Sequence, residues 1–150
     1  MILKLNYKAI PTEGGYIAPA PVRASAGAAG LDLHASIDNT VTLKPGERQM
    51  IPCGVAVEIP RGFVGLIFGR SGNGAKYGVT LANSVGVIDE DYRGELKATL
   101  INHGDKDFTI EPGDRICQLV LVPYAAAELN QVEELSSTDR GEGGYGSTGK

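Results

Sequence analysis

The chain has 150 residues, a formal net charge of −4 and an isoelectric point near 5.2. A chain of this length is long enough for one domain with its own core, burying roughly 70% of the surface of the unfolded polypeptide. Its basic residues are scattered through the sequence. We therefore expect no nucleic-acid partner, because binding along a duplex requires a clustered basic face.

No stretch approaches the roughly 18 apolar residues that cross a bilayer, and residues 1–8 lack the apolar region of a secretory signal. We expect no membrane partner and a cytoplasmic location. The two cysteines, Cys53 and Cys117, lie in or beside apolar runs. This position favours buried free thiols, and a count of two also allows a single disulfide.

Short runs that alternate apolar and polar residues, or are rich in β-branched residues, recur along the chain between Gly- and Pro-containing turn signals. The runs are residues 31–35, 41–43, 54–59, 63–68, 84–88, 96–101 and 116–122. Many short strands with little helix predict an all-β fold, either a sandwich, a jelly roll or a barrel. Only residues 72–77 could form a turn or two of helix.

The first candidate site lies in the run 31–35. Alternation would put Leu31, Leu33 and Ala35 on one face of a strand and Asp32 and His34 on the other. Asp32 is then either an ordinary solvent-facing residue or a site residue. A zinc site at His34 is not expected, because the only other histidine, His103, is distant in sequence.

The loop after the run 63–68 contains Arg70, Ser71 and Gly72. A guanidinium, a hydroxyl and the open backbone of a glycine-rich turn are groups that bind phosphate oxygens. The alternative is an ordinary Ser/Gly/Asn loop.

An acidic segment, residues 89–94, separates the runs 84–88 and 96–101 and is predicted to be the turn of a hairpin. Turns favour Asp and Gly for conformational reasons alone. Asp89 differs because it directly follows an apolar strand end, where the sheet would hold its carboxylate in position to orient a water molecule.

Two features stand out after this segment. Gln118 is a polar residue in an otherwise apolar strand, and Arg115 just before it is a candidate ion-pair partner. Residues 136–150 are too rich in glycine to pack stably. We therefore divide the chain into a β domain, residues 1–135, and a flexible C-terminal arm, residues 136–150.

Five segments together resemble the motifs of the trimeric deoxyuridine triphosphate nucleotidohydrolases (dUTPases), and they occur in the family order. They are residues 29–33 (AGLDL), 70–72 (RSG), 86–94 (GVIDEDYRG), 113–119 (GDRICQL) and 140–149 (RGEGGYGSTG). The resemblance implies a distorted jelly roll assembled as a homotrimer. It also implies hydrolysis of dUTP to dUMP and pyrophosphate by water attack at the α-phosphorus, which keeps uracil out of DNA and supplies dUMP for thymidylate synthesis.

The resemblance implies a catalytic role for Asp89, which would hold the attacking water, and for Gln118, which would lie near the phosphates and that water. The implied cofactor is Mg²⁺, held mainly by the substrate phosphates. Asp32 would contact the metal through a bound water.

Phosphate binding is assigned by the same resemblance to Arg70, Ser71 and Gly72 for the α- and β-phosphates, and to Arg140 and Ser147 for the γ-phosphate. The arm that carries the last two residues would fold over bound nucleotide.

Uracil recognition is assigned to Asn83, to backbone groups around Val87 and Ile88, and to Lys97 on the returning strand. Asn83 can donate and accept at once, which suits the edge of a uracil ring, and its alternative role is a strand-end turn. Tyr92 would pack under the deoxyribose and exclude a 2′-hydroxyl.

The chain departs from the common family pattern at three positions: Gly69 stands where proline is frequent, Cys117 where alanine is frequent, and Tyr145 where phenylalanine is usual. Tyr145 would still stack on uracil, next to Gly146 of the arm motif. Two alternative functions are a dCTP deaminase of the same superfamily and a nucleotide-sensing regulatory protein built on the dUTPase fold.

Overall fold

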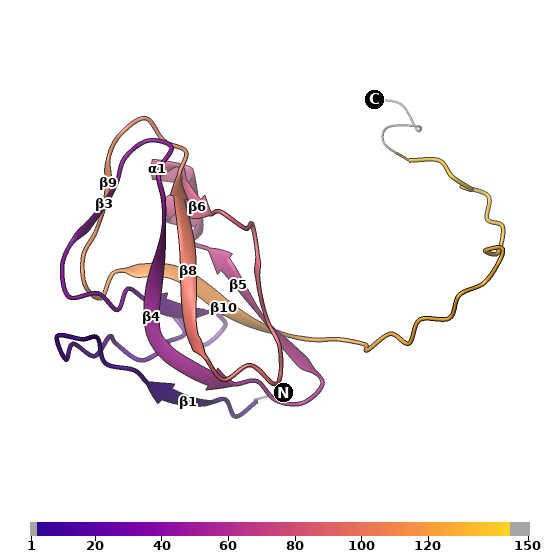
Figure 1. The fold of residues 1–150 in the computed structure, drawn as a ribbon, viewed down its shortest axis with the longest axis horizontal. Coiled ribbons are helices and arrows are strands. Elements are labelled where there is room, and N and C mark those ends of the chain that lie inside the picture. Colours follow the sequence, from indigo (N-terminus) through magenta and orange to yellow (C-terminus); the bar gives the residue numbers. More distant parts are fainter. Residues whose placement is uncertain (1–2, 145–150) are drawn as a thin grey trace.

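The computed structural model describes residues 3–144. Within these residues, ten strands form two four-stranded sheets, ordered β1-β4-β8-β6 and β2-β10-β5-β7, and a two-stranded sheet, β3-β9, and one helix lies outside the sheets (Figure 1). The strands are β1 (Asn6–Ala9), β2 (Leu31–His34), β3 (Val41–Leu43), β4 (Arg48–Glu58), β5 (Phe63–Gly69), β6 (Val79–Leu81), β7 (Gly86–Ile88), β8 (Glu95–Asn102), β9 (Phe108–Ile110) and β10 (Arg115–Pro123), and the helix is α1 (Ser71–Tyr77). The all-β prediction is confirmed.

The core lies between the inner faces of the two larger sheets. Strand β8 shows why these residues form strands: Leu96, Ala98 and Leu100 are buried and the residues between them are not. This two-residue period puts one side of the strand in the core. Cys53 on β4 and Cys117 on β10 are both buried and free, with their sulfurs 4.0 Å apart, so the prediction of free thiols is confirmed.

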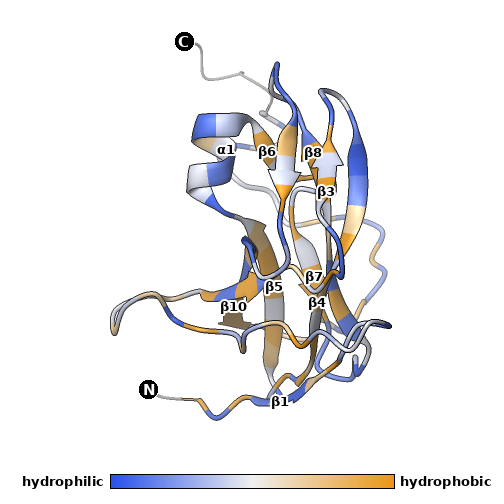
Figure 2. Cartoon of the chain, turned by 90° about the vertical axis from the view of Figure 1, so that its left-hand side faces the viewer, coloured by the Kyte–Doolittle hydropathy of each residue, from blue (hydrophilic) through white to orange (hydrophobic). Residues whose placement is uncertain are grey.

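The helix α1 is confirmed close to its predicted bounds. It buries none of its residues, and in Figure 2 its ribbon carries no hydrophobic stretch. It ends at Gly78, whose φ of 70° is the left-handed conformation that glycine adopts without strain. The helix thus continues from the end of β5 as a surface element, and Arg70 is the residue that links the two.

The predicted hairpin between residues 84–88 and 96–101 is wrong. Strand β7 pairs with β5 in one sheet, whereas β8 pairs with β4 and β6 in the other. Two glycines allow β7 to approach β5: a Cβ on Gly86 would lie 3.2 Å from Ile67, and one on Gly65 would lie 3.2 Å from Ile88. The segment 89–94 is therefore a connection between sheets.

After β10, the chain leaves the body and runs away from it (Figure 1). Residues 124–144 contain no strand or helix, and Leu129 and Leu135 are 96% and 89% exposed. No helix in the described part of the chain is long and apolar enough to cross a membrane.

Candidate active site

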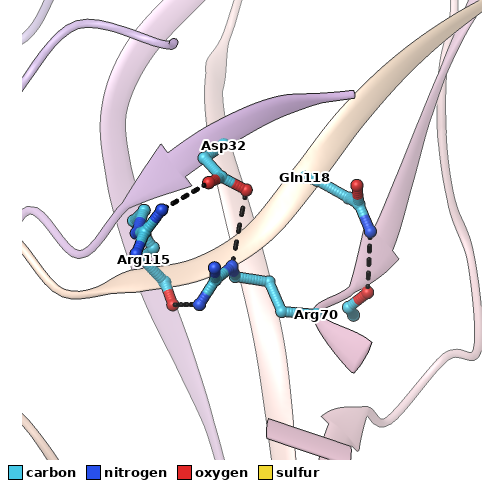
Figure 3. Close-up of polar contacts among 5 residues, drawn as sticks. Asp32, Arg70, Arg115 and Gln118 are labelled. Atoms are coloured by element: carbon cyan, nitrogen blue, oxygen red, sulfur yellow. Dashed lines mark hydrogen bonds and ion pairs between the residues drawn. The ribbon is translucent and has the colours of Figure 1, made fainter. Parts of the chain in front are cut away.

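A cluster of charged side chains lies where β2, β10 and the end of β5 meet (Figure 3). The Asp32 carboxylate contacts Nε of Arg70 at 3.4 Å through one oxygen and Nη1 of Arg115 at 3.2 Å through the other. The predicted ion-pair role of Arg115 is confirmed. Since two guanidinium groups share one carboxylate, the cluster has an excess positive charge and attracts anions.

Strand β10 holds this cluster together because it is hydrogen-bonded to both neighbours. Gln118 lies opposite Asp32 on β2 and opposite Phe68 on β5. A bulge between Arg115 and Cys117 shifts the alternation, and it lets Arg115 reach Asp32 while Cys117 stays in the core.

Gln118 has a defined position at the edge of the cluster. Its side-chain amide donates to the carbonyl of Gly69 at 3.3 Å (Figure 3). Its oxygen lies over Gly30, where a Cβ would come within 2.5 Å of it, so the glycine makes room for this side chain. Ser71 and Gly72 follow Arg70 directly in the first turn of α1.

Of the two alternatives for Asp32, the ordinary solvent-facing residue is wrong, because Asp32 is only 8% exposed, and His34 on the same face of the strand is buried as well. An irregular segment that is distant in sequence pairs with β2 at this point: Val22 exchanges two backbone hydrogen bonds with Asp32, at 2.8 and 3.3 Å. No signal in the alternation of residues 31–35 could have predicted this pairing.

His34 is a residue of this region whose burial the sequence did not indicate. Burial lowers its pKa from the usual value of 6.5, because desolvation penalises the imidazolium. The charges of Asp32, which raises the pKa, and of Arg115 and Arg70, which lower it, act in addition. Among the residues described, its Nδ1 atom has no hydrogen-bond partner.

The second group of predicted residues lies on the segment 89–94 and beside it. Asp89 is exposed, and Tyr92 donates its hydroxyl to the carbonyl of Glu95 at 3.0 Å. The Tyr92 ring lies against Gly94, where a Cβ would come within 2.5 Å of the phenol carbon. A hollow of about 550 Å³ next to this segment is lined by Val64, Val87, Asp89, Glu90, Asp91 and Tyr124.

Strands β7 and β8 have edges that are free to bind a ligand. Ala82, just after β6, is the last residue before β7 that is hydrogen-bonded to β8: its backbone amide donates to the carbonyl of Thr99 at 2.8 Å. The chain then diverges from β8 and pairs with β5 through β7. Within the described residues, β7 is the outer strand of its sheet, and the part of β8 that contains Lys97 pairs with β4 alone. The backbone around Val87 and Ile88 therefore retains unpaired polar groups.

Asn83 takes part in the turn where this divergence begins. Its side-chain amide donates to the carbonyl of Val85 at 3.3 Å, next to Ser84, whose φ is 63°. The structural role that the sequence left open is thus present. A primary amide retains further hydrogen-bonding capacity for a ligand.

The two groups lie at opposite ends of β5 in one chain. Strand β7 pairs Ile88 with Gly65 near the start of β5, whereas Arg70 follows its last residue. At 3.3 Å per residue, Asp89 and Arg70 are about 20 Å apart along the strand direction. The structure therefore brings Asp32, Arg70 and Gln118 together and leaves Asp89 and Tyr92 elsewhere.

The arm residues are distant from both groups or outside the described part. Arg140 donates through Nε to the carbonyl of Gly143 at 2.8 Å, within the arm itself. Tyr145, Gly146 and Ser147 lie outside the described residues.

Comparison with known proteins connects these observations to a family. The family model described as dUTPase matches residues 17–149. The chain belongs to the dUTPase family. The resemblance deduced from the five motifs is confirmed over nearly the whole chain.

Relatives extend the match. The chain is 45% identical to the deoxyuridine 5′-triphosphate nucleotidohydrolase of Alcanivorax borkumensis over 99% of each chain, and 54% identical to that of Syntrophotalea carbinolica over 86% of this chain and 88% of the relative. Among solved structures, the dUTPase of Staphylococcus bacteriophage 80alpha with dUpNHpp has a TM-score of 0.85 at 34% identity, covering 98% of this chain and 99% of that one. The predicted dUTPase jelly roll is thereby confirmed for this chain.

Proposed function

We propose that this dUTPase-family chain hydrolyses dUTP to dUMP and pyrophosphate by water attack at the α-phosphorus. The observation that carries the proposal is the cluster of Asp32, Arg70 and Arg115, whose excess positive charge suits a triphosphate, in a chain that matches the family from residue 17 to residue 149. The product dUMP would feed thymidylate synthesis, and removal of dUTP would keep uracil out of DNA.

In this proposal the phosphate chain binds beside the cluster. Arg70, Ser71 and Gly72 would bind the α- and β-phosphates, and Gln118, fixed by Gly69, would lie next to them and to the attacking water. Arg70 contacts Asp32 through Nε and donates through Nη1 to the carbonyl of Arg115 at 3.5 Å, which leaves Nη2 to reach phosphate oxygens.

Asp89 would position the attacking water and accept its proton. A solvent-exposed carboxylate is a weak base, so most of the rate must come from in-line positioning and from charge neutralisation at the phosphates. Positioning of the water would come from Asp89 at one end of β5, and charge neutralisation would come from the cluster around Arg70 at the other end.

The base and the sugar would bind at the diverging strands. The unpaired edges near Val87, Ile88 and Lys97 supply backbone donors and acceptors for the uracil ring, together with the Asn83 amide. Tyr92, held against Gly94, would occupy the space that a 2′-hydroxyl requires.

Magnesium is the proposed cofactor, and the residues fit a metal ion that the protein contacts through bound water and does not ligate directly. Both oxygens of Asp32 are engaged by arginines, so this carboxylate suits contact with a metal-bound water better than direct ligation. When bound to the substrate phosphates, Mg²⁺ would neutralise charge that develops during the reaction.

The separation of the two groups supports a site that is shared between copies of the chain. About 20 Å is too far for Asp89 and Arg70 of one chain to act on the same phosphorus, whereas a symmetric oligomer can bring different ends of neighbouring chains together. A homotrimer, with the C-terminal arm of one subunit closing over the site of another, is the assembly we propose.

A pyrophosphate-release assay tests the function. Purified protein should release pyrophosphate rapidly from dUTP and far more slowly from dTTP, dCTP and UTP, and EDTA should abolish the release. Ammonia release from dCTP would instead support the deaminase, which the dUTPase family match does not favour. Tight binding of dUTP without turnover would support the regulatory protein. The buried free thiols suit a reducing compartment, and we propose a cytoplasmic location.

A further inference from the structure

The carboxylate of Glu90 joins three segments that are far apart in the sequence. Its Oε2 atom accepts a hydrogen bond from the backbone amide of Gly62 at 2.8 Å and one from the hydroxyl of Tyr124 at 3.3 Å. These two partners are also joined to each other, because the Tyr124 amide donates to the Gly62 carbonyl at 3.2 Å. The turn between β4 and β5, the segment 89–94 and the first residue after β10 are thus held at one point.

Glu90 differs in this respect from the carboxylates on either side of it. Asp89 and Asp91 are exposed, whereas Glu90 is half-buried. Gly62 supports the geometry, since its φ of 80° lets the turn present its amide to Glu90. A carboxylate that accepts two hydrogen bonds from different segments restricts the backbone that carries it.

The remaining anchors of segment 89–94 hold its other end. Arg93 contacts Glu58 at 3.7 Å, and Tyr92 is bonded to the carbonyl of Glu95. Arg93 also donates to the Glu90 carbonyl at 2.6 Å, which bonds the segment to itself. In the described residues, Asp89 is thus held on both sides: Ile88 before it is paired with Gly65 of β5, and the Glu90 side chain after it ties the segment to Gly62 and Tyr124.

Tyr124 lies at the point where the C-terminal segment leaves the body. It is the residue after the end of β10, and it lines the same hollow as Asp89 and Val87. A change in the direction of the C-terminal segment at this residue would be transmitted to Glu90 through the hydroxyl.

We propose that Glu90 and Tyr124 are positioning residues for the reaction: their contact fixes the placement of Asp89 and links it to the direction in which the C-terminal segment departs. Neither side chain needs to touch the substrate. This inference rests on the proposed role of Asp89 in dUTP hydrolysis.

Steady-state kinetics with dUTP tests the proposal in four variants. Glu90→Ala removes both hydrogen bonds, and it should lower kcat by about 10- to 100-fold with KM changed less than about twofold, since misplacement by an ångström is costly for chemistry. Glu90→Gln keeps an acceptor oxygen and should retain kcat within about threefold. Tyr124→Phe keeps the ring and should lower kcat several-fold. The matched control is Asp91→Ala, which removes the neighbouring exposed carboxylate and should leave kcat unchanged.

The double variant Glu90→Ala with Tyr124→Phe should be no slower than Glu90→Ala alone, because the hydroxyl acts through the carboxylate. Three results would overturn the proposal. They are a double variant in which the two losses of kcat multiply, an equal loss of kcat in Asp91→Ala, and a KM increase at constant kcat in Glu90→Ala. If Glu90→Ala does not fold, the proposal still requires that Tyr124→Phe lowers kcat several-fold and that Glu90→Gln keeps kcat within about threefold of wild type. A wild-type protein that releases no pyrophosphate would refute the proposed function, whereas an active wild type with unaffected variants would refute this inference alone.

Discussion

At the scale of single residues, two carboxylates of this chain are placed for different tasks. Asp32 is buried and contacts Arg70 and Arg115, so it organises positive charge. Asp89 is exposed at the end of β7 and has no such partner among the described residues, so its carboxylate is free to orient a water. We therefore expect an electrostatic role for the first and a chemical role for the second.

Replacement of Asp89 by asparagine should leave dUTP binding intact and reduce turnover. The amide keeps the size of the side chain and loses the charge that polarises water, and general-base contributions are on the order of 10²- to 10⁴-fold. Single-turnover kinetics and a binding titration measure the two quantities separately, with Asp91→Asn as the matched control. Turnover close to wild type would remove Asp89 from the mechanism.

His34 should make the stability of the protein depend on pH. Its pKa is lower in the folded state than the unfolded value of 6.5, so the unfolded state binds a proton more readily as pH falls. Stability from the neutral imidazole is fully present above pH 6.5 and declines as pH falls below it. Urea unfolding at pH 8 and pH 5.5, at one protein concentration, measures the free energy of unfolding. The free energy lost between pH 8 and pH 5.5 should be larger for wild type than for His34→Gln.

The exposed His103 gives the control for this measurement, since His103→Gln should lose as much stability as wild type. Equal losses in wild type and His34→Gln would contradict the role assigned to burial at His34.

At the scale of elements, the divergence of β7 from β8 creates the candidate base site. The β-branched content of residues 84–88 and the alternation of residues 96–101 predicted the two strands correctly. Neither pattern could identify the partner of β7, because such patterns do not specify which strand lies alongside. The same limit applies to Asp32, whose backbone pairs with Val22 in an irregular segment that is distant in sequence. The site residues themselves were predicted from motif resemblance, and their roles stay predictions.

Gly94 should matter for sugar selection because it seats the Tyr92 ring. A methyl group at residue 94 would lie 2.4 Å from the Tyr92 hydroxyl oxygen, so Gly94→Ala must displace the ring. We expect the ratio of kcat/KM for dUTP to that for UTP to fall by about 10-fold or more, since one lost steric contact is worth about 1–3 kcal/mol. Gly27→Ala, at a position with no atom within 4 Å of the added Cβ, is the control. An unchanged ratio in Gly94→Ala would refute the steric account.

At the scale of the whole molecule, the described part of the C-terminal arm contributes little to the fold. Within the described residues 125–144, every recorded hydrogen bond stays inside the arm, between residues 138 and 143. Strand periodicity predicted the core, and glycine content predicted that the arm would not pack. The distance between the two groups of predicted site residues, one around Asp32 and Arg70 and one around Asp89 and Tyr92, could not be predicted, because it depends on the pairing of β7 with β5.

Removal of residues 139–150 should leave folding and assembly unchanged and abolish most activity. The described part of the arm adds no core burial, so the melting temperature should stay within a few degrees, whereas closure over substrate would supply contacts at the phosphates. Calorimetry, size-exclusion chromatography and pyrophosphate release measure the three properties. A truncated protein with full activity would show that the arm does not act as a lid.

In the proposed assembly, Asp89 and Arg70 act on the same substrate from different chains. Its most direct test is co-assembly of Asp89→Asn subunits with Arg70→Ala subunits in equal amounts, each inactive alone. If each site takes the two residues from different subunits, random mixing gives about a quarter of sites both intact residues, and activity should return to about 25% of wild type. Mixed oligomers as inactive as both parents would contradict the shared site and place both residues in one chain.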